Sequence, residues 1–378
     1  MPRVVGRSSG TVFQLDSLPT LGSGTEGVVY RAGDAAVKVY TADLDAVAVD
    51  KIDTLIRFAK AVPGFAWPVE PVHDTAGRPV GFVMPLATGE SLEALTDARK
   101  TGTIPDGRKA AIGASLAAAV AAAHAAPALT MALGDTVKAG NIVVDLRTAT
   151  VTVVDAAAVS LFRFRAADGR LIDAVETLAT PGYRPPEALA NPAATPSRAA
   201  DLFALAVALF ELIFGRPPME PQSCAATVGL DLDDAVRRGL FVRYTAHPDF
   251  RAPSYDPVVV PADIDDLFRA AFLGAPHLRP SAAEWVARLT AWRDSKAAPR
   301  TARAVPWQSR AVRFARRHEA AAAAVIAAIA TVFLGVWVAR ELPAALRPQP
   351  SPPPKSAPAP APAPGKPVGP PLFQELFR

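Results

Sequence analysis

Cysteine is almost absent from this sequence of 378 residues, and its one copy, Cys224, excludes an internal disulfide framework and suits a reducing compartment. No apolar run follows the first arginines, so no signal peptide is expected at the N-terminus. An excess of one charge is also lacking, because 40 Lys and Arg against 36 Asp and Glu leave a formal net charge of only +4. Bulk electrostatics therefore do not require a nucleic-acid partner, and none is expected.

A glycine-rich stretch near the N-terminus carries the first candidate site. Gly22, Gly24 and Gly27 form G-x-G-x-x-G, a spacing that dinucleotide-binding loops share. Those loops open a helix, whereas β-branched residues follow here and continue a strand. Lys38 lies in the next apolar strand. A lone lysine there can simply face water at a sheet edge, but the spacing favours a glycine-rich hairpin over phosphates, with Lys38 holding their oxygens.

The stretch 133–155 carries the second candidate site. Two apolar runs, Ile142–Val144 and Val151–Val154, predict a β-hairpin flanked by Asp135, Asn141 and Asp155. Hard cations take oxygen ligands, and an incoming hydroxyl needs an acceptor for its proton. Taken alone, the same residues also suit ordinary turn chemistry. Combined with the glycine-rich stretch, they predict a site for Mg²⁺ and phosphoryl transfer.

The order of these motifs resembles the eukaryotic-type protein kinase family over residues 11–295. The resemblance implies an α+β, bilobal fold with a small β-rich N-lobe and a helical C-lobe. It also implies that ATP and Mg²⁺ are used. The implied nucleotide-binding residues are Gly22, Gly24, Gly27, Lys38, Met84 and Leu86. Asp135 and Lys38 are the implied catalytic residues, and Asn141 and Asp155 the implied metal ligands.

The second half of the chain extends the resemblance. Residues 180–187, reading TPGYRPPE, resemble the segment that receives the substrate. Asp201 resembles the buried aspartate at the start of the long helix, and Arg279 the arginine that pairs with the Glu187 position. Hydrophobic periodicity predicts helices over 44–60, 107–126, 201–214, 232–239, 262–272 and 281–292.

Four departures from the family pattern bear on activity. Leu133-Gly134-Asp135 replaces H-R-D, and Asp135 and Asn141 are one position further apart than usual, an excess that a bulge at Gly140 would absorb. The D-F-G position reads Asp155-Ala156-Ala157, which keeps the carboxylate and loses the phenylalanine. The helix after Lys38 has no glutamate, so that Asp50, Asp53 or neither would pair with Lys38.

Two functions remain open. The first is a Ser/Thr protein kinase, because phosphoryl transfer demands mainly positioning and charge neutralisation and the four polar residue types are present. The alternative is a pseudokinase, nucleotide-binding or inert, that acts as a membrane-anchored scaffold. The substrate segment disfavours a small-molecule phosphotransferase. Thr180 resembles the threonine of Ser/Thr kinases or is a turn residue, and Thr177 is an autophosphorylation site or a solvated loop residue.

The resemblance is strongest to a divergent bacterial branch, whose members occur beside von Willebrand-type and phosphatase-like proteins. Such partners are implied only by the resemblance, and the protein substrate is not indicated. Within this reading, residues 1–10 form an N-terminal arm and residues 11–295 the kinase-like domain.

The C-terminal part predicts a membrane anchor. Residues 320–339 carry no charge and are long enough to span a bilayer, although a buried alanine-rich helix has the same composition. The membrane expected is the cell membrane, that is, the inner or plasma membrane. Four arginines precede the span, so the kinase domain would lie on the cytoplasmic side of this membrane and the tail outside it. The domains continue as a basic linker over 296–318, one transmembrane helix over 319–340 and a Pro/Ala-rich disordered tail over 341–378.

Overall fold

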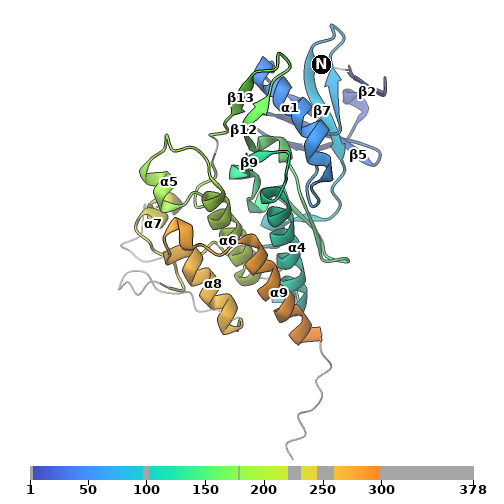
Figure 1. Cartoon of the computed structure of the whole chain (residues 1–378). Coiled ribbons are helices and arrows are strands. Elements are labelled where there is room, and N and C mark those ends of the chain that lie inside the picture. The colour runs from blue at the N-terminus through green and yellow to red at the C-terminus, as the bar shows by residue number, and fades with distance from the viewer. Residues whose placement is uncertain (1–2, 97–101, 178, 220–230, 245–258, 298–378) are drawn as a thin grey trace, which may run out of the picture. The chain divides into compact units, whose positions relative to one another are not determined.

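The computed structural model describes residues 3–96, 102–177, 179–219, 231–244 and 259–297. They belong to one compact unit, Met1–Pro299, and form a β-rich lobe and a helical lobe (Figure 1). The predicted transmembrane helix, the Pro/Ala-rich tail and Cys224 lie outside the described residues. Within those ranges, no helix combines the length and the hydropathy that a membrane span requires.

The small lobe is built on one seven-stranded sheet with the order β2-β1-β6-β7-β5-β4-β3. Its strands are β1 (Arg3–Gly6), β2 (Val12–Gln14), β3 (Thr20–Ser23), β4 (Gly27–Ala32), β5 (Ala35–Tyr40), β6 (Glu70–His73) and β7 (Pro79–Pro85). Residues 3–6, predicted to be part of an N-terminal arm, instead pair with both β2 and β6. The sheet therefore begins almost at the first residue of the chain.

The period of two along β5 decides which way Lys38 points. Val37 and Val39 pack with Val4, Val72 and Val80 in a small core on one face of the sheet. Ala36, Lys38 and Tyr40 alternate with them and face the other side, where Ala36 and Tyr40 join the main core. Lys38 is thus a buried residue of an inner strand, which excludes the interpretation of a water-facing edge lysine.

Helix α1 (Ala46–Phe58) covers that second face of the sheet. Asp45 caps it by accepting a hydrogen bond from the backbone nitrogen of Ala48. Its apolar side places Ile52 and Leu55 in the main core, as the predicted amphipathic pattern requires. The 3-10 turn η2 (Ala59–Ala61) then ends the helical stretch.

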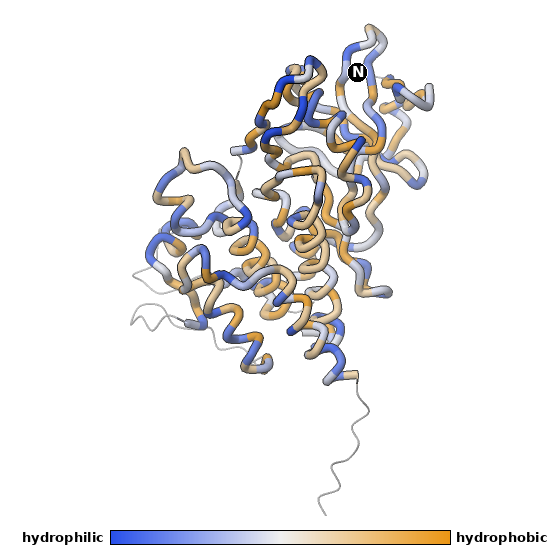
Figure 2. Tube along the Cα trace, viewed as in Figure 1, coloured by the Kyte–Doolittle hydropathy of each residue, from blue (hydrophilic) through white to orange (hydrophobic). Residues whose placement is uncertain are grey.

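The larger lobe packs around two central helices, α4 (Asp106–His124) and α6 (Arg198–Phe214), which Figure 2 shows as mostly hydrophobic. α4 lies along α9 (Ala282–Ala297), and α6 contacts α8 (Ala262–Leu273). The remaining described helices are α2 (Leu92–Leu95), α5 (Pro186–Ala190) and α7 (Leu232–Arg237). The six predicted helices are all present, with ends that differ by a few residues.

Two three-stranded sheets complete the described strands. The predicted hairpin is β10 (Ile142–Asp145) with β11 (Thr150–Val153), and β8 (Glu90–Ser91) adds a third strand. A second hairpin, β12 (Ser160–Arg165) with β13 (Leu171–Ala174), pairs with β9 (Thr130–Ala132). This second hairpin is not among the elements predicted from the sequence, and it packs against α1.

Candidate active site

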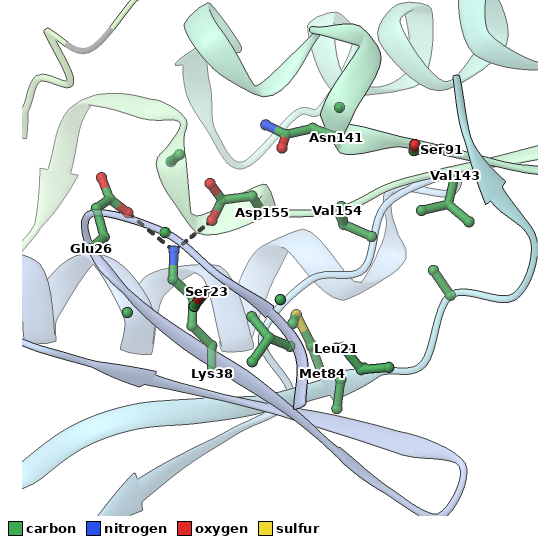
Figure 3. Close-up of a pocket in the computed structure, with 18 of the residues that line it drawn as sticks. Leu21, Ser23, Glu26, Lys38, Met84, Ser91, Asn141, Val143, Val154 and Asp155 are labelled. Carbon is green, nitrogen blue, oxygen red and sulfur yellow. Dashed lines mark hydrogen bonds and ion pairs between the residues drawn. The ribbon is translucent and has the colours of Figure 1, made fainter. Parts of the chain in front are cut away.

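A cleft of about 660 Å³ lies where the glycine-rich strands meet the β10–β11 hairpin. Its walls bring together all the predicted site residues: Gly22, Gly24, Gly27, Lys38, Met84, Leu86, Asp135, Asn141 and Asp155. Figure 3 shows Leu21, Met84, Val143 and Val154 as its apolar part and Glu26, Lys38, Asn141 and Asp155 as its polar part. The cleft therefore has one end suited to a flat apolar group and one suited to charged oxygens.

Lys38 is held by two carboxylates at the polar end. Its Nζ lies 2.6 Å from Asp155 Oδ1 and 3.1 Å from Glu26 Oε2 (Figure 3). Neither predicted partner on α1 contacts it: Asp50 Oδ1 accepts from the backbone nitrogen of Ala167, and Asp53 pairs with Arg7. Of the three alternatives left open by the sequence, the structure therefore selects the one in which neither Asp50 nor Asp53 pairs with Lys38, because both side chains contact other groups.

The charged neighbours fix the protonation of Lys38. Burial alone would lower its pKa, but negative charge on Tyr40 once that hydroxyl ionises, and on Asp155 and Glu26 throughout, outweighs burial and holds the pKa above its usual value. Lys38 Nζ also lies 4.8 Å from the centre of the Tyr40 ring. Burial raises the pKa of Tyr40 to about 12, so its hydroxyl stays neutral at physiological pH. A permanent cation thus faces the cleft, as phosphate binding requires.

The loop from Leu133 to Asn141 presents Asp135 to the cleft. Asp135 Oδ1 accepts from the backbone nitrogen of Thr180 at 2.6 Å, and its Oδ2 lies 2.5 Å from Lys138 Nζ. Asn141 Nδ2 donates to the carbonyl oxygen of Asp135 at 3.3 Å. Two 3-10 turns, η3 (Gly134–Thr136) and η4 (Ala139–Asn141), accommodate the additional residue. Gly140 lies within η4, and the positive φ of 55° occurs instead at Gly134.

Asp201 anchors the start of this loop from the first turn of α6. It is buried, and its two carboxylate oxygens accept from the backbone nitrogens of Leu133 and Gly134, each at 2.9 Å. His124, at the end of α4, lies 2.9 Å from Asp201 through Nε2. A buried carboxylate with such donors is well satisfied, so this contact fixes Asp135 relative to the large lobe.

Asn141 and Asp155 offer the oxygen donors that Mg²⁺ prefers. Both line the cleft, and Figure 3 shows both side chains. Asp155 adopts a left-handed conformation with φ 55° and ψ 33°, which few non-glycine residues adopt and which aspartate and asparagine adopt more readily than most. The described residues contain no group of three or more His, Cys, Asp or Glu side chains arranged for a metal. This pair fits a magnesium ion whose other ligands are phosphate and water oxygens.

Two of the glycines have different physical roles. A Cβ at Gly27 would lie 2.4 Å from the carbonyl oxygen of Val39, so Gly27 permits the close approach of β4 to β5. A Cβ at Gly22 would meet no atom within 4 Å, and Gly22 lines the cleft. Gly27 therefore serves the sheet, whereas Gly22 leaves open the space in which a phosphate group would approach the backbone.

The predicted substrate segment is fixed to the large lobe at several points. The Tyr183 hydroxyl accepts from the backbone nitrogen of Ala139 at 3.0 Å and donates to Glu211 at 2.8 Å. Arg279 and Glu187 form the predicted pair through two hydrogen bonds, of 2.5 and 2.8 Å. Burial alone would raise the pKa of Glu187, but the hydrogen bonds from Arg279 prevail and lower it.

Four polar residues at or beside the cleft escaped sequence reasoning. Glu26 and Lys138 lie inside the two motifs, at positions where the general pattern allows any residue. Glu176 lines the cleft and pairs with Lys51 of α1. Glu26 and Lys138 could have been noticed as charged residues within phosphate-binding motifs, but no local signal connects Lys51 with Glu176.

Comparison with known proteins gives the family. A family model described as "Protein kinase domain" matches residues 72–289, which is more than half of the chain. A search of curated proteins found no match.

Proposed function

The chain belongs to the protein kinase family, and from this premise we propose that it transfers the γ-phosphoryl group of ATP to Ser or Thr hydroxyls of proteins. The observation that carries the proposal is the convergence of Lys38, Asp135, Asn141 and Asp155 on one cleft below the glycine-rich strands. The family match supports a phosphotransferase in general. The convergence of these four side chains supports a specific role in phosphoryl transfer for each of them.

Each polar residue of the cleft would have a different role in the reaction. Lys38 would hold the phosphate oxygens, and Asn141 and Asp155 would hold Mg²⁺. When bound, Mg²⁺ neutralises charge on the phosphates. Asp135 would orient the substrate hydroxyl and accept its proton, and Lys138 beside it would balance the negative charge that gathers there. The apolar walls near Met84 and Leu86 would receive the adenine ring.

Protein rather than small-molecule substrates are supported by the segment 180–187. Thr180 donates its backbone N–H to Asp135, so the segment lies directly beside the proposed acceptor of the proton. A peptide that docks on this segment would bring its hydroxyl to Asp135. The choice of Ser or Thr rests on the presence of Thr180 at this point, as in Ser/Thr kinases that the sequence resembles.

Membrane anchoring is part of the proposal and rests on the sequence. Residues 320–339 would cross the membrane once, with the kinase domain on the cytoplasmic side and the Pro/Ala-rich tail outside. Partners of the von Willebrand or phosphatase type would follow from the bacterial branch that the sequence resembles. The anchor would confine phosphorylation to proteins that reach the membrane surface.

A pseudokinase scaffold is the second candidate, and the partners of Lys38 favour it. Glu26 lies between the glycine-rich strands β3 and β4, beside Lys38. Its negative charge at this point opposes the binding of phosphate. No carboxylate of α1 takes that place. A protein in which Glu26 permanently holds Lys38 would keep the fold and its docking surfaces without turnover.

One experiment separates the two candidates. The full-length chain is incubated with radiolabelled ATP, Mg²⁺ and a generic Ser/Thr substrate, beside Lys38→Ala and the exposed control Lys60→Ala. The proposal expects label in the wild type and in Lys60→Ala, and a loss of at least about 100-fold in Lys38→Ala. Equal labelling by Lys38→Ala, or no labelling by a folded wild type, would reject the kinase proposal. A thermal shift with nucleotide would then identify a nucleotide-binding scaffold.

A further inference from the structure

Helix α1 presents a lysine at its buried side, and that lysine is paired. Lys51 is 4% exposed, and its Nζ forms an ion pair with Glu176 Oε1. Burial lowers the pKa of Lys51, and the attraction of Glu176 opposes this effect. A buried cation is costly without its partner, so the contact fixes α1 to whatever carries Glu176.

Glu176 lies on the chain that leads into the substrate segment. It follows the β12–β13 hairpin directly, and its backbone nitrogen donates to the buried hydroxyl of Ser160 at 2.9 Å. Glu176 is therefore held at the backbone by β12 and at the side chain by α1. It also lines the cleft with Lys38 and Asp155.

The short distance along the chain connects this anchor with Asp135. Only three residues separate Glu176 from Thr180, whose backbone N–H donates to Asp135 Oδ1 at 2.6 Å. Four residues of extended chain span at most about 14 Å, so the position of Glu176 limits the position of Thr180. A movement of α1 that carried Glu176 with it would pull on the hydrogen bond to Asp135.

A second contact joins α1 to the same hairpin. Asp50, adjacent to Lys51, accepts from the backbone nitrogen of Ala167 at 3.3 Å, in the turn between β12 and β13. Two consecutive residues of α1 therefore hold the turn and the outgoing end of one hairpin. The helix and the hairpin are connected as one unit.

We propose that Lys51 and Glu176 are a positioning pair that couples helix α1 to the placement of the substrate segment against Asp135. The inference rests on the proposed function, because it assigns these residues a role in phosphoryl transfer. Neither residue needs to touch the substrate. The pair acts through Thr180 and Asp135, so its loss disturbs alignment at the hydroxyl more than binding of the nucleotide.

The test uses the full-length chain with Glu176→Gln, Lys51→Met and the double variant. We expect each single variant to lower kcat by at least about tenfold, as misalignment of a reacting group does, with the KM for ATP within about twofold. The double variant should lose no more than either single one, since both remove the same contact. Additive losses, or a change confined to the KM for ATP, would overturn the proposal.

A second readout does not depend on turnover. The amide of Thr180 should exchange with deuterium faster by at least about tenfold in each single variant, because its hydrogen bond to Asp135 opens more often. Unchanged exchange in either folded variant would overturn the coupling even if the wild type transfers no phosphate. Failure of the proposed function therefore remains distinguishable from failure of this inference.

Lys51→Met keeps the test usable if Glu176→Gln does not fold. Glu176→Gln leaves a buried cation without a counter-charge, whereas Lys51→Met leaves a carboxylate whose side chain is 35% exposed and can be hydrated. Asp50→Asn is the matched control on the same helix, since the amide oxygen can still accept from Ala167. We expect Asp50→Asn to retain wild-type kcat and Thr180 exchange. An equal effect of this control would show a general response of α1 and overturn the specific role of the pair.

Discussion

Lys38 Nζ lies 2.6 Å from Asp155 Oδ1, although the two are 117 positions apart in the chain. The contact joins the glycine-rich lobe to the hairpin that carries the proposed metal ligands. Because Lys38 remains charged and Asp155 is a carboxylate, a phosphate group with its Mg²⁺ would meet both signs of charge in one place. The predictions below follow from this pair and the groups around it.

Asp135→Asn should abolish phosphoryl transfer and leave nucleotide binding largely intact. The amide oxygen can still accept from Thr180, but the group can no longer take a proton or balance Lys138. We expect a fall in kcat of about 10²- to 10⁴-fold, typical of the loss of a general base. Radiolabel transfer and the thermal shift with nucleotide measure the two effects. Asp168→Asn, in the turn after β12, is the control, and unchanged turnover in Asp135→Asn would contradict the assignment.

Glu26→Gln should tighten nucleotide binding. In the structure Glu26 holds Lys38 at 3.1 Å, so an incoming phosphate must compete with a carboxylate of like charge. Glu26 is about one-third exposed, and solvent screens the effect, so we expect about fivefold in Kd, or about 1 kcal/mol. Calorimetric titration with Mg²⁺ and ATP measures it. Asp34→Asn removes the same charge from the turn between β4 and β5 and should change little.

The opposite result would assign Glu26 a different role. Weaker binding in Glu26→Gln, with Asp34→Asn unchanged, would mean that Glu26 orients Lys38 for phosphate. The glycine-rich strands would then supply the carboxylate that sequence reasoning sought on α1.

The site residues could be predicted from sequence because each is fixed by local order. Gly22 to Gly27 form a hairpin motif, Lys38 follows at the spacing of the next strand, and Asp135 to Asp155 span one hairpin. Such relations depend on chain geometry over a few tens of residues. The period of two along β5 even sets the face to which Lys38 belongs.

The partners of these residues could not be predicted in the same way. Whether Lys38 meets Asp50, Asp53 or Glu26 depends on the rotation of α1 against the sheet, and Arg7 and Ala167 bind the two aspartates elsewhere. Lys51 and Glu176 are 125 residues apart. Neither residue belongs to a motif, so only the packing of α1 on the β12–β13 hairpin brings them together.

Gly27→Ala should destabilise the fold, in contrast to Gly22→Ala. The added Cβ would lie 2.4 Å from the carbonyl oxygen of Val39, so β4 and β5 would have to separate. We expect a loss of about 1–3 kcal/mol in the free energy of unfolding, as in other overpacked sites. Urea denaturation measures it. The Cβ of Gly22→Ala meets no atom within 4 Å, and equal losses in both variants would contradict the distinction.

Glu187→Gln should remove a pH-dependent part of the stability. Arg279 is buried with a side chain 2% exposed, and it donates two hydrogen bonds to Glu187, whose side chain is 40% exposed. Breaking a buried pair typically costs about 3–5 kcal/mol, and the exposure of Glu187 reduces the expected loss at pH 7 to about 2 kcal/mol. The pKa of Glu187 is lowered in the folded state, so its contribution is complete above the ordinary glutamate pKa of about 4.3 and is lost as the pH falls through the lowered value.

The urea midpoints of wild type and Glu187→Gln should therefore differ at pH 7 and converge as the pH falls below about 4. Asp294→Asn is the control, since its pair with Arg293 is exposed on both sides and should contribute almost nothing at any pH. A difference between wild type and Glu187→Gln that stays constant from pH 7 to pH 3 would mean that the carboxylate charge does not stabilise the fold. If the two midpoints instead agreed at every pH, Arg279 would hold the large lobe through its bond to the carbonyl oxygen of Ala199, which the glutamine variant leaves intact.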